Sequence, residues 1–546
     1  MKADLKTYYS DGQDIQSPFD IAVIIPTLLR PSLAVALRSV FTQDFNGRVQ
    51  ILIGIDHPER NFNFKEILKE RPDHMTVTLF WPGYSTNTKH GGLHHIFGGG
   101  TLRSTLSFVA NARALCYLDD DNWFAPNHLS SLHTALDGKD WAFSYRWFVD
   151  ENTGKVICPD RWESVGPGEG VFANNFNGFV DTNCLMIDTI ACAHHLAAWS
   201  LAFKDGRGAD RHFFDVLSKE NRYGTSKQVT CHYTIKTSDS NHQARLDYIK
   251  GKNIPTGPEN YPSWKPAADA VPHTKSKVKT AGSWQIFGDH SHLFDCAVII
   301  PTIGRDNLKR AVRSIYQQDY PGRVQILIGL DNGTWPHDLE KGLPDNMGLI
   351  LCDPGYSTST RHGGVHEAHD GGALRSILSL MAHTPYVTYL DDDNWWRKNH
   401  LSCLTKAIKD HHYAYTTRMF VHPDGQTEVT PDHWESIGPD KGLYAYKMRG
   451  FVDPNCLMVN VKSCINVLPL WTKPIENDEE KMSADRRVFH FLASKAKGVP
   501  TNEVSVDYVM NVDDPMHPLR TMYLGHHWIN ADMASRRKRL SLTQKR

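Results

Sequence analysis

The sequence predicts two tandem α/β domains, each built on a mostly parallel β-sheet with flanking helices. Three observations support this prediction: the length of the chain, an internal duplication, and the alternation of apolar and amphipathic segments. At 546 residues the chain exceeds what one hydrophobic core usually organises. A hydrophobic content of 40% and a charged content of 22% are typical of globular proteins with a large core.

The duplication sets the predicted domain organisation. The segment that begins at Ile21, IAVIIPTLLR, matches CAVIIPTIGR, which begins 275 residues later at Cys296. A period of this length is far beyond the repeat of a solenoid and indicates two copies of a whole domain. A stretch rich in Pro and Lys separates the copies. We therefore predict a first domain at residues 1–250, a connector at 251–290, a second domain at 291–533 and a basic tail at 534–546.

Within each copy, short apolar runs alternate with segments of helical periodicity. In the first copy, IAVIIP and VQILIGID flank LAVALRSVFTQ, a pattern typical of parallel strands joined by a helix. Ligands bind such sheets at the carboxyl ends of the strands. Thr27, Asp56 and Asp119 each follow an apolar run, so we expect them to share one site.

Composition argues against several classes of protein. Lys and Arg total 60 against 61 Asp and Glu, which disfavours a nucleic acid as partner. The ten cysteines form no CxxC pair, so neither a disulfide scaffold nor a zinc ribbon is expected. The sequence has no signal peptide and no apolar run of membrane-spanning length, which predicts a cytoplasmic protein. The basic tail leaves peripheral contact with a membrane open.

The string YLDDDNW occurs in both copies and carries the most specific chemistry. It places Asp119, Asp120 and Asp121 directly after an apolar strand, and Asp391–Asp393 after the matching one. Strand alternation directs the outer two carboxylates to one side and the middle one away. Adjacent carboxylates repel unless a cation lies between them, and Mg²⁺ or Mn²⁺ is the expected ion. An acidic turn that caps the next helix is the alternative, which retention of the full string in both copies disfavours.

Glycine-rich loops precede the acids in place of a phosphate-binding P-loop or a GxGxxG turn. The first loop reads PGYSTNTKHGG in one copy and PGYSTSTRHGG in the other, and GGTLRS and GGALRS follow. Lys89 and Arg361 occupy matching positions, as do Arg103 and Arg375. These cations could neutralise a diphosphate, whereas flexible loops with incidental charge are the alternative.

Taken in order, these motifs resemble family 2 glycosyltransferases, which have the Rossmann-like GT-A fold, and the tandem layout resembles bifunctional bacterial polysaccharide synthases. The resemblance rests on PT after the first strand, the acid after ILIGI, the Arg of GGTLRS, and the Asp-x-Asp motif. It implies a nucleotide-sugar donor. With the two loop cations, the residues expected to bind it are Thr27, Asp56, Lys89, Arg103 and Asp119 in the first copy and Thr302, Asp331, Arg361, Arg375 and Asp391 in the second.

The resemblance also implies a metal site in each copy. Asp121 and Asp393 would be direct ligands of Mn²⁺ or Mg²⁺. Many enzymes of this family add a later histidine as a ligand, and His242 and His517 occupy matching positions. In a chain with 29 histidines, an ordinary structural role for these two is the alternative.

A further acid in each copy fits the role of catalytic base. The family usually has Glu-Asp at the start of a late helix, and this chain has Ala209-Asp210 and Ala484-Asp485 instead. The resemblance implies that the Asp removes a proton from the acceptor hydroxyl and that direct attack inverts the sugar's anomeric centre. An Asp that merely favours the helix dipole is the alternative.

The motifs PDRWES and PDHWES lie between the acids and the base candidates. Trp162 and Trp434 could stack on a sugar of the acceptor while Glu163 and Glu435 accept its hydroxyl hydrogen bonds. Aromatic packing inside a loop explains the motif equally well.

These expectations combine into one predicted function with two alternatives. The sequence predicts a metal-dependent, inverting glycosyltransferase with two active sites, which uses UDP-sugars as donors and a saccharide or glycoconjugate as acceptor. A nucleotidyltransferase on a similar fold is the first alternative, disfavoured because PTLLRPS and PTIGRDN lack its basic glycine-rich motif. A non-catalytic carbohydrate-binding protein is the second.

Overall fold

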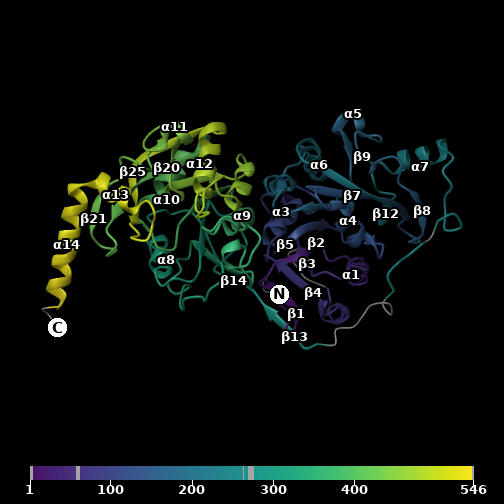
Figure 1. Ribbon diagram of the computed structural model, residues 1–546, viewed down its shortest axis with the longest axis horizontal. Helices are drawn as coiled ribbons and strands as arrows, with labels where there is room; N and C mark the ends of the chain where they lie inside the picture. Colours follow the sequence, from purple (N-terminus) through teal and green to yellow (C-terminus); the bar gives the residue numbers. More distant parts are fainter. Residues whose placement is uncertain (1–3, 57–61, 262, 268–275, 544–546) are drawn as a thin grey trace. The chain divides into compact units, whose positions relative to one another are not determined.

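The computed structural model describes residues 4–56, 62–261, 263–267 and 276–543. It divides into two compact units, Met1–Gln285 with Cys352–Glu367, and Ile286–Leu351 with Ala368–Arg546. Each unit combines one large sheet with flanking helices (Figure 1). The predicted fold class, two α/β domains, is therefore confirmed.

The first sheet is parallel at its centre, and most of the outer strands pair antiparallel, except that β7 (Trp141–Asp150) and β12 (Tyr223–Ile235) run parallel. Four neighbouring strands run parallel: β4 (Met75–Trp81), β3 (Val49–Ile55), β2 (Phe19–Thr27) and β5 (Ala112–Tyr117). Beyond β5 the sheet continues with β11 (Leu185–Asp188), β7, β12 and β6 (Trp123–Phe124). Beyond β4 it continues with β1 (Asp4–Ser10) and β13 (Val278–Ala281). The strand β8 (Val156–Pro159) pairs with β7.

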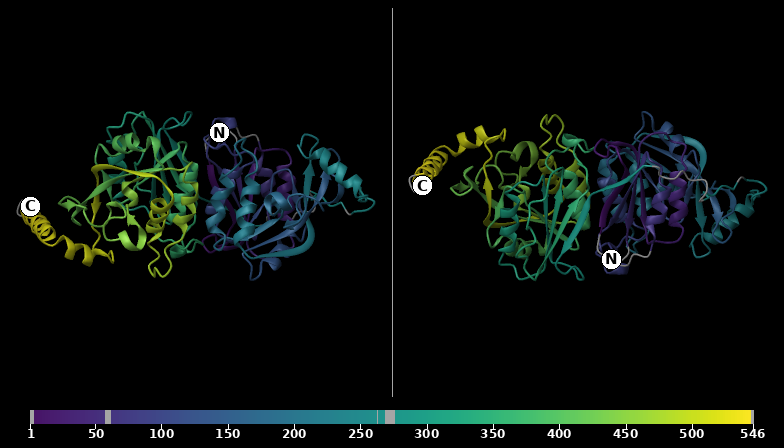
Figure 2. Two further views of the ribbon diagram at one scale, coloured as in Figure 1. Left: turned by 90° about the horizontal axis from the view of Figure 1, so that it is seen from above. Right: turned by 90° about the horizontal axis from the view of Figure 1, so that it is seen from below.

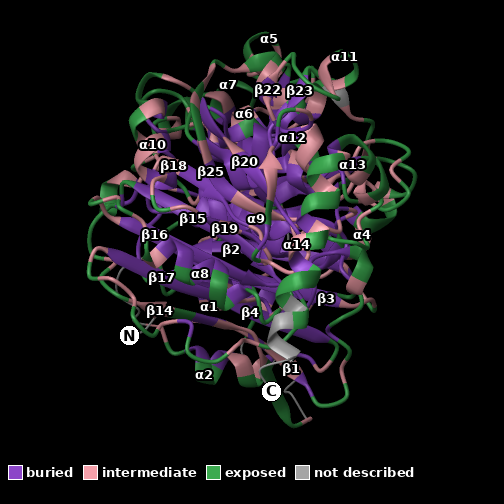
Figure 3. Cartoon of the chain, turned by 90° about the vertical axis from the view of Figure 1, so that its left-hand side faces the viewer, coloured by how far each residue is buried: buried purple, intermediate pink, exposed green. Residues whose placement is uncertain are grey.

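Helices cover both faces of this sheet. On one face, α1 (Leu33–Phe41) and α4 (His128–Leu136) share a hydrophobic cluster with residues of β2, β3 and β4. On the other face lies α3 (Gly100–Val109), and a side chain at Gly54 of β3 would collide with Leu106 of this helix. Burial of both faces explains why β2 and β3 are almost wholly apolar. The strands appear buried and the outer surfaces of the helices exposed in Figure 3.

The second sheet repeats the strand order of the first from β17 to β19. Its order is β14-β17-β16-β15-β18-β24-β20-β25-β19, and β21 pairs with β20. The bounds are β14 (Ser283–Phe287), β15 (Cys296–Thr302), β16 (Val324–Leu330), β17 (Met347–Asp353), β18 (Tyr386–Tyr389), β19 (Trp395–Trp396), β20 (Tyr413–Val421), β21 (Glu428–Pro431), β24 (Leu457–Asn460) and β25 (Gly498–Val509). Its main helices are α8 (Leu308–Tyr316), α9 (Gly372–Met381), α10 (His400–Ala407) and α12 (Ala484–Lys495).

The segment expected to be a connector contributes strands to both sheets. Within residues 251–290, β13 adds to the edge of the first sheet and β14 to the edge of the second. The stretch before β13 packs on the first unit, where the Trp123 indole donates a hydrogen bond of 2.8 Å to the carbonyl of Trp264. Residues 268–275 lie outside the described part of the chain.

The basic tail is helical as far as it is described. Residues 534–543 belong to α14 (His526–Thr543), which extends away from the body of its unit in both views of Figure 2. None of the described helices combines the length and the apolar character that crossing a membrane requires.

Candidate active site

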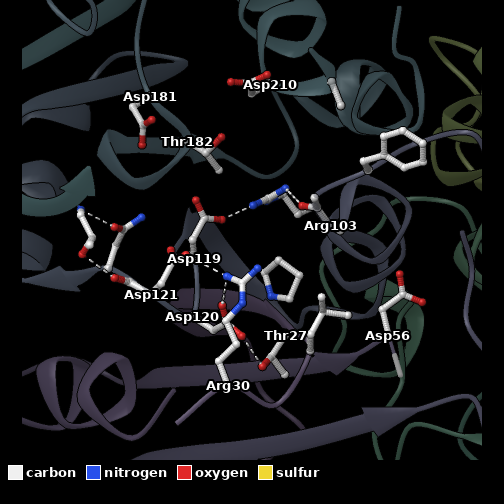
Figure 4. Close-up of a pocket in the computed structure, with 18 of the residues that line it drawn as sticks. Thr27, Arg30, Asp56, Arg103, Asp119, Asp120, Asp121, Asp181, Thr182 and Asp210 are labelled. Carbon is white, nitrogen blue, oxygen red and sulfur yellow. Dashed lines mark hydrogen bonds and ion pairs between the residues drawn. The ribbon is translucent and has the colours of Figure 1, made fainter. Parts of the chain in front are cut away.

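A pocket of about 350 Å³ lies at the carboxyl ends of the parallel strands in the first unit (Figure 4). Thr27 ends β2, Asp56 follows β3, and Asp119 lies just beyond β5. The start of α6 (Ala209–Glu220) closes the opposite side with Asp210. Thr27, Asp56 and Asp119 thus share one pocket, as expected for strand ends of a parallel sheet, and Asp210 faces them from a helix.

The three acids of YLDDDNW have different environments. Asp120 is buried and accepts a hydrogen bond of 2.6 Å from the Thr27 hydroxyl. Asp119 and Asp121 are only partly buried. Burial raises the pKa of Asp120 above its usual value, although the bond from Thr27 and the charge of Arg30 oppose this effect. Asp120 therefore fixes the loop to β2, whereas the carboxylates of Asp119 and Asp121 face the pocket.

Asp119 is held by a cation on one side and an amide on the other. The Arg103 guanidinium forms an ion pair with its Oδ1 atom. The Asn183 side chain donates to its Oδ2 atom at 2.9 Å and accepts from its backbone N–H at 2.6 Å. The carboxylate is thus fixed on the pocket wall beside an arginine suited to a phosphate.

Asp121 is bound by two cations. Arg30 Nη1 bridges the acids, 3.0 Å from Asp120 Oδ1 and 2.8 Å from Asp121 Oδ2. The ammonium group of Lys236, which follows β12, contacts the same Oδ2 atom of Asp121. Neither Arg30 nor Lys236 was predicted as a site residue. The retained Arg in PTLLRPS and PTIGRDN was a signal for Arg30, but no pattern in the sequence linked Lys236 to the acids.

The second unit repeats most of these contacts. The Thr302 hydroxyl donates to Asp392 at 2.5 Å, and Arg375 pairs with Asp391 at 2.6 Å. The other equivalents are Arg305, which lies 2.8 Å from Asp392, and Asn455, which donates to Asp391 at 2.7 Å. Asp331 is buried at the end of β16.

Asp393 differs from its counterpart in the first unit. Its ion pair is with Arg305 alone among the described residues, at 3.4 Å. Burial, together with the neighbouring charges of Asp391 and Asp392, raises the pKa of Asp393 to about 7. The carboxyl therefore lacks the close cations that surround Asp121.

A buried arginine supports the acid cluster from beneath. Arg146 of β7 pairs with Asp160 at 2.8 Å, Glu163 at 2.8 Å and Asp181 at 2.5 Å. Burial by itself would lower the pKa of Arg146, but the three carboxylates outweigh it and hold this pKa well above its usual value. Arg418 repeats the arrangement in the second unit, with Asp432, Glu435 and Asp453.

This arginine is connected to the pocket by two residues that the sequence reasoning missed. Asp181, which lines the pocket, accepts from the Asn183 amide at 2.7 Å, and Asn183 in turn holds Asp119. The motifs GFVDTNCLM and GFVDPNCLM, retained in both copies, were the available signal.

The prediction that Glu163 and Glu435 bind acceptor hydroxyls is wrong. Both carboxylates are buried and paired with arginines, Glu163 also with Arg245 at 2.9 Å. The PDRWES turn forms because Asp160 accepts the backbone N–H groups of the next residues, which directs Glu163 inward.

Trp162 and Trp434 pack against tyrosines of their own units. Trp162 stacks on Tyr248 with ring centroids 5.5 Å apart, and Trp434 stacks on Tyr523 at 4.4 Å. Trp162 does not line the described pocket. The alternative interpretation, aromatic packing in a loop, describes the first motif better.

His242 lies outside the lining of the first pocket, and His517 packs against a tryptophan. His242 begins α7 (His242–Gly251) and is absent from the lining of the pocket, because the chain leaves the pocket at Asp239. His517 begins α13 (His517–Leu524), and its ring packs edge-on against Trp528 with centroids 5.3 Å apart. Within the described ranges, no three His, Cys, Asp or Glu side chains are grouped to hold a metal ion.

The residues expected to contact the nucleotide are placed in different ways. Asp56 lines the pocket but is buried, and it accepts from the Ser85 hydroxyl at 2.9 Å and the Thr86 N–H at 2.6 Å. Lys89 is exposed and lies over the Phe97 ring at 3.7 Å, outside the pocket lining. Arg361, on the 3₁₀ turn Thr360–His362, belongs to the segment that groups with the first unit.

The base candidates begin equivalent helices. Asp210 lies in the first turn of α6 and Asp485 in the first turn of α12. Burial raises the pKa of Asp485 to about 7; the Arg486 charge lowers it, and the charges of Asp370 and Asp453 raise it further. At neutral pH such a carboxyl is poised to accept a proton.

Removal of the buried arginine should strongly destabilise its unit. We expect Arg146→Met to lower the free energy of unfolding by about 3–5 kcal/mol, because three buried carboxylates lose their cation. Arg207, exposed and paired with Asp205, is the matched control, and Arg207→Met should change stability by at most about 0.5 kcal/mol. Urea titration of the full chain measures both. Equal stability of the two variants would contradict the supporting role of Arg146.

Comparison with known proteins finds only distant structural likeness. No protein-family model matches the chain, and no curated protein sequence matches it. The solved structure of residues 1–349 of S. aureus TarS is similar over 39% of this chain and 60% of that chain, with 13% identity and a TM-score of 0.30. The same protein in complex with UDP gives 14% identity over 42% of this chain and 65% of that chain, also with a TM-score of 0.30. The chain thus covers less than two thirds of these structures, and likeness at this level does not assign it to a family.

Proposed function

We propose that this chain is a glycosyltransferase with two active sites, which transfers sugars from nucleotide-diphosphate donors to a saccharide or glycoconjugate acceptor. The family resemblance favours UDP-sugars as the donors. One observation carries the proposal. In the first unit, an acid at the start of a helix faces, across an open pocket, carboxylates flanked by arginines at the ends of parallel strands. The second unit retains the acids, the arginines and their contacts.

The cationic wall of the pocket suits the donor's diphosphate. Arg30 and Arg103 line the pocket beside the acids, and each presents a planar guanidinium that can bind phosphate oxygens in pairs. Thr27 and Asp56 lie on the same side of the pocket. In this proposal they receive the nucleoside, and the sugar extends towards Asp210.

The two sites differ in how well they fit a metal ion. In the second unit, Asp391 and Asp393 offer two partly exposed carboxylates, which suits Mg²⁺ or Mn²⁺ held jointly with substrate phosphates. When bound, the ion supplies positive charge to the departing diphosphate. In the first unit, Asp121 is already bound by two cations, so its residues do not fit the ion.

The chemical step needs a base on the acceptor side. Asp210, and Asp485 in the second site, would take the proton from the acceptor hydroxyl as its oxygen bonds to the anomeric carbon. The bond from that carbon to the diphosphate breaks, and its electron pair leaves with the nucleoside diphosphate. Attack from the face opposite the leaving group inverts the anomeric centre.

One of the positions that differ between the copies lies close to the base candidate of the second unit, where the charge of Asp370 acts on Asp485. Phe97 and Gly98 of the first pocket correspond to His369 and Asp370 in the second copy. Asp370 lies 3.6 Å from Arg375, and burial raises its pKa to about 6. A carboxyl in place of a glycine changes the polarity around the sugar, which supports different transfers at the two sites.

A nucleotidyltransferase and a non-catalytic carbohydrate-binding protein remain the alternatives. A donor screen on the full chain that follows release of nucleoside diphosphate separates them. Release that depends on an acceptor supports glycosyl transfer, release of pyrophosphate supports nucleotidyl transfer, and sugar binding without turnover supports the third function.

Loss of one base should remove one transfer. We expect Asp210→Asn and Asp485→Asn each to slow one of two transfers by about 10²- to 10⁴-fold, because the amide cannot accept the proton. Binding of the donor should be unchanged, since neither residue lies on the nucleoside side of the pocket in this proposal. Product analysis by mass spectrometry and donor binding by calorimetry measure the two effects. Full activity in both variants would show that the base is misassigned.

The second transfer should depend on pH through the ionisation of Asp485. Measured in Asp210→Asn, its rate should rise as the pH passes through about 7, because only the ionised carboxyl accepts a proton. Asp370→Asn removes a neighbouring negative charge, so it should lower the pKa of Asp485 and move this rise to lower pH. A pH–rate profile that is flat across neutral pH, or one that Asp370→Asn does not shift, would contradict the assignment of Asp485 as the base.

A further inference from the structure

The acid cluster of the first unit carries a built-in cation that the second lacks. Lys236 lies directly after β12 and contacts Asp121 through its ammonium group. Two further bonds fix this stretch to the acid loop: the Thr234 hydroxyl donates to the Asp121 carbonyl at 2.8 Å, and the Thr234 N–H donates to Asn122 at 2.8 Å. The Lys236 N–H also donates to Asp239 at 3.1 Å. The backbone thus holds Lys236 beside the acids.

At the corresponding position the second unit has Asn511. This residue is exposed, and its side-chain oxygen accepts a hydrogen bond of 3.0 Å from the N–H of Asp513. It therefore caps its own turn and does not form the contact that Lys236 makes. The Asp393 side chain is 38% exposed, against 19% for Asp121, so the second cluster stays open to an added ligand.

The charges of the two acid clusters also differ in a way that favours an added cation in the second unit. In the first unit, Arg30, Arg103 and Lys236 face the three carboxylates of Asp119–Asp121, which leaves no net charge. In the second unit, two arginines face three carboxylates, and Asp370 adds a fourth close to Arg375. When its carboxyls are ionised, the second cluster therefore has an excess of negative charge, which a divalent cation would offset.

We propose that Lys236 replaces the divalent cation in the first site, so that the first transfer needs no metal while the second requires one. This inference rests on the proposed function, because it assigns the cation that faces the donor's diphosphate in each site. A lysine ammonium is a compact point charge that can bind a carboxylate and a phosphate oxygen together. A divalent ion at Asp121 would have to displace Lys236 or lie beside it, and repulsion between the two cations opposes binding.

The test counts Mn²⁺ ions bound to the full chain by electron paramagnetic resonance, in the presence of uridine diphosphate. We expect one bound ion for the wild type, two for Lys236→Asn, and one for Lys236→Arg, which keeps the charge. Asn511→Lys should lose the ion of the second site and bind none, while Asn511→Ala, the matched control, should retain it. The Asn511 pair keeps the proposal testable if a substitution at Lys236 prevents folding.

Several outcomes would overturn the proposal. Two ions or none in the wild type would do so, as would one ion in folded Lys236→Asn or in folded Asn511→Lys. A chelator should abolish the second transfer in Asp210→Asn and spare the first in Asp485→Asn, and the reverse would also contradict the proposal.

The failure of this inference is distinguishable from failure of the proposed function. Binding of uridine diphosphate to the wild type is measured separately by calorimetry. If the nucleotide binds but the Mn²⁺ count is two, only the role of Lys236 is wrong. If the nucleotide binds neither site, the glycosyltransferase proposal itself fails.

Discussion

The pocket depends on one buried arginine in each unit. Arg146 is almost completely buried and is stable there because three carboxylates surround it. Through Asp181 and Asn183, the same network fixes Asp119 on the pocket wall. Because Arg146 lies on β7 while its partners come from the turn after β8 and from the segment before β11, the arginine joins separate parts of the chain. The position of Asp119 is thus set by buried ion pairs that lie outside the pocket lining, around Arg146.

Each unit must also stabilise the three adjacent carboxylates of its acid cluster. Both units anchor the middle acid with a threonine and an arginine, and both place an arginine on the first acid. They differ at the third, where the first unit has Lys236 and the second has an open carboxyl. The two copies therefore share the contacts of the first two acids and differ in the cation beside the third, in line with separate roles for the two proposed sites.

Much of this arrangement could be predicted from the sequence, because apolar runs fix the strands and parallel strands bring their ends together. That reasoning placed Thr27, Asp56 and Asp119 at one site, whereas Asp210, which lines the same pocket, was expected only from the family resemblance. It failed for Glu163, since retention in both copies marks a structural ion pair as strongly as a ligand. The importance of Lys236 could not be predicted, because its partner lies 115 residues away in the chain. Local sequence patterns predict the helices and strands, whereas contacts between residues far apart in the chain decide which charged side chains pair.

The central claim is that each unit binds one nucleotide-sugar donor at its acid cluster. Calorimetric titration of the full chain with uridine diphosphate, in the presence of Mn²⁺, tests it most directly. The account predicts two nucleotides bound per chain, with Arg103→Ala and Arg375→Ala each weakening one of the two sites. No binding, or one nucleotide whose affinity neither substitution changes, would contradict the account.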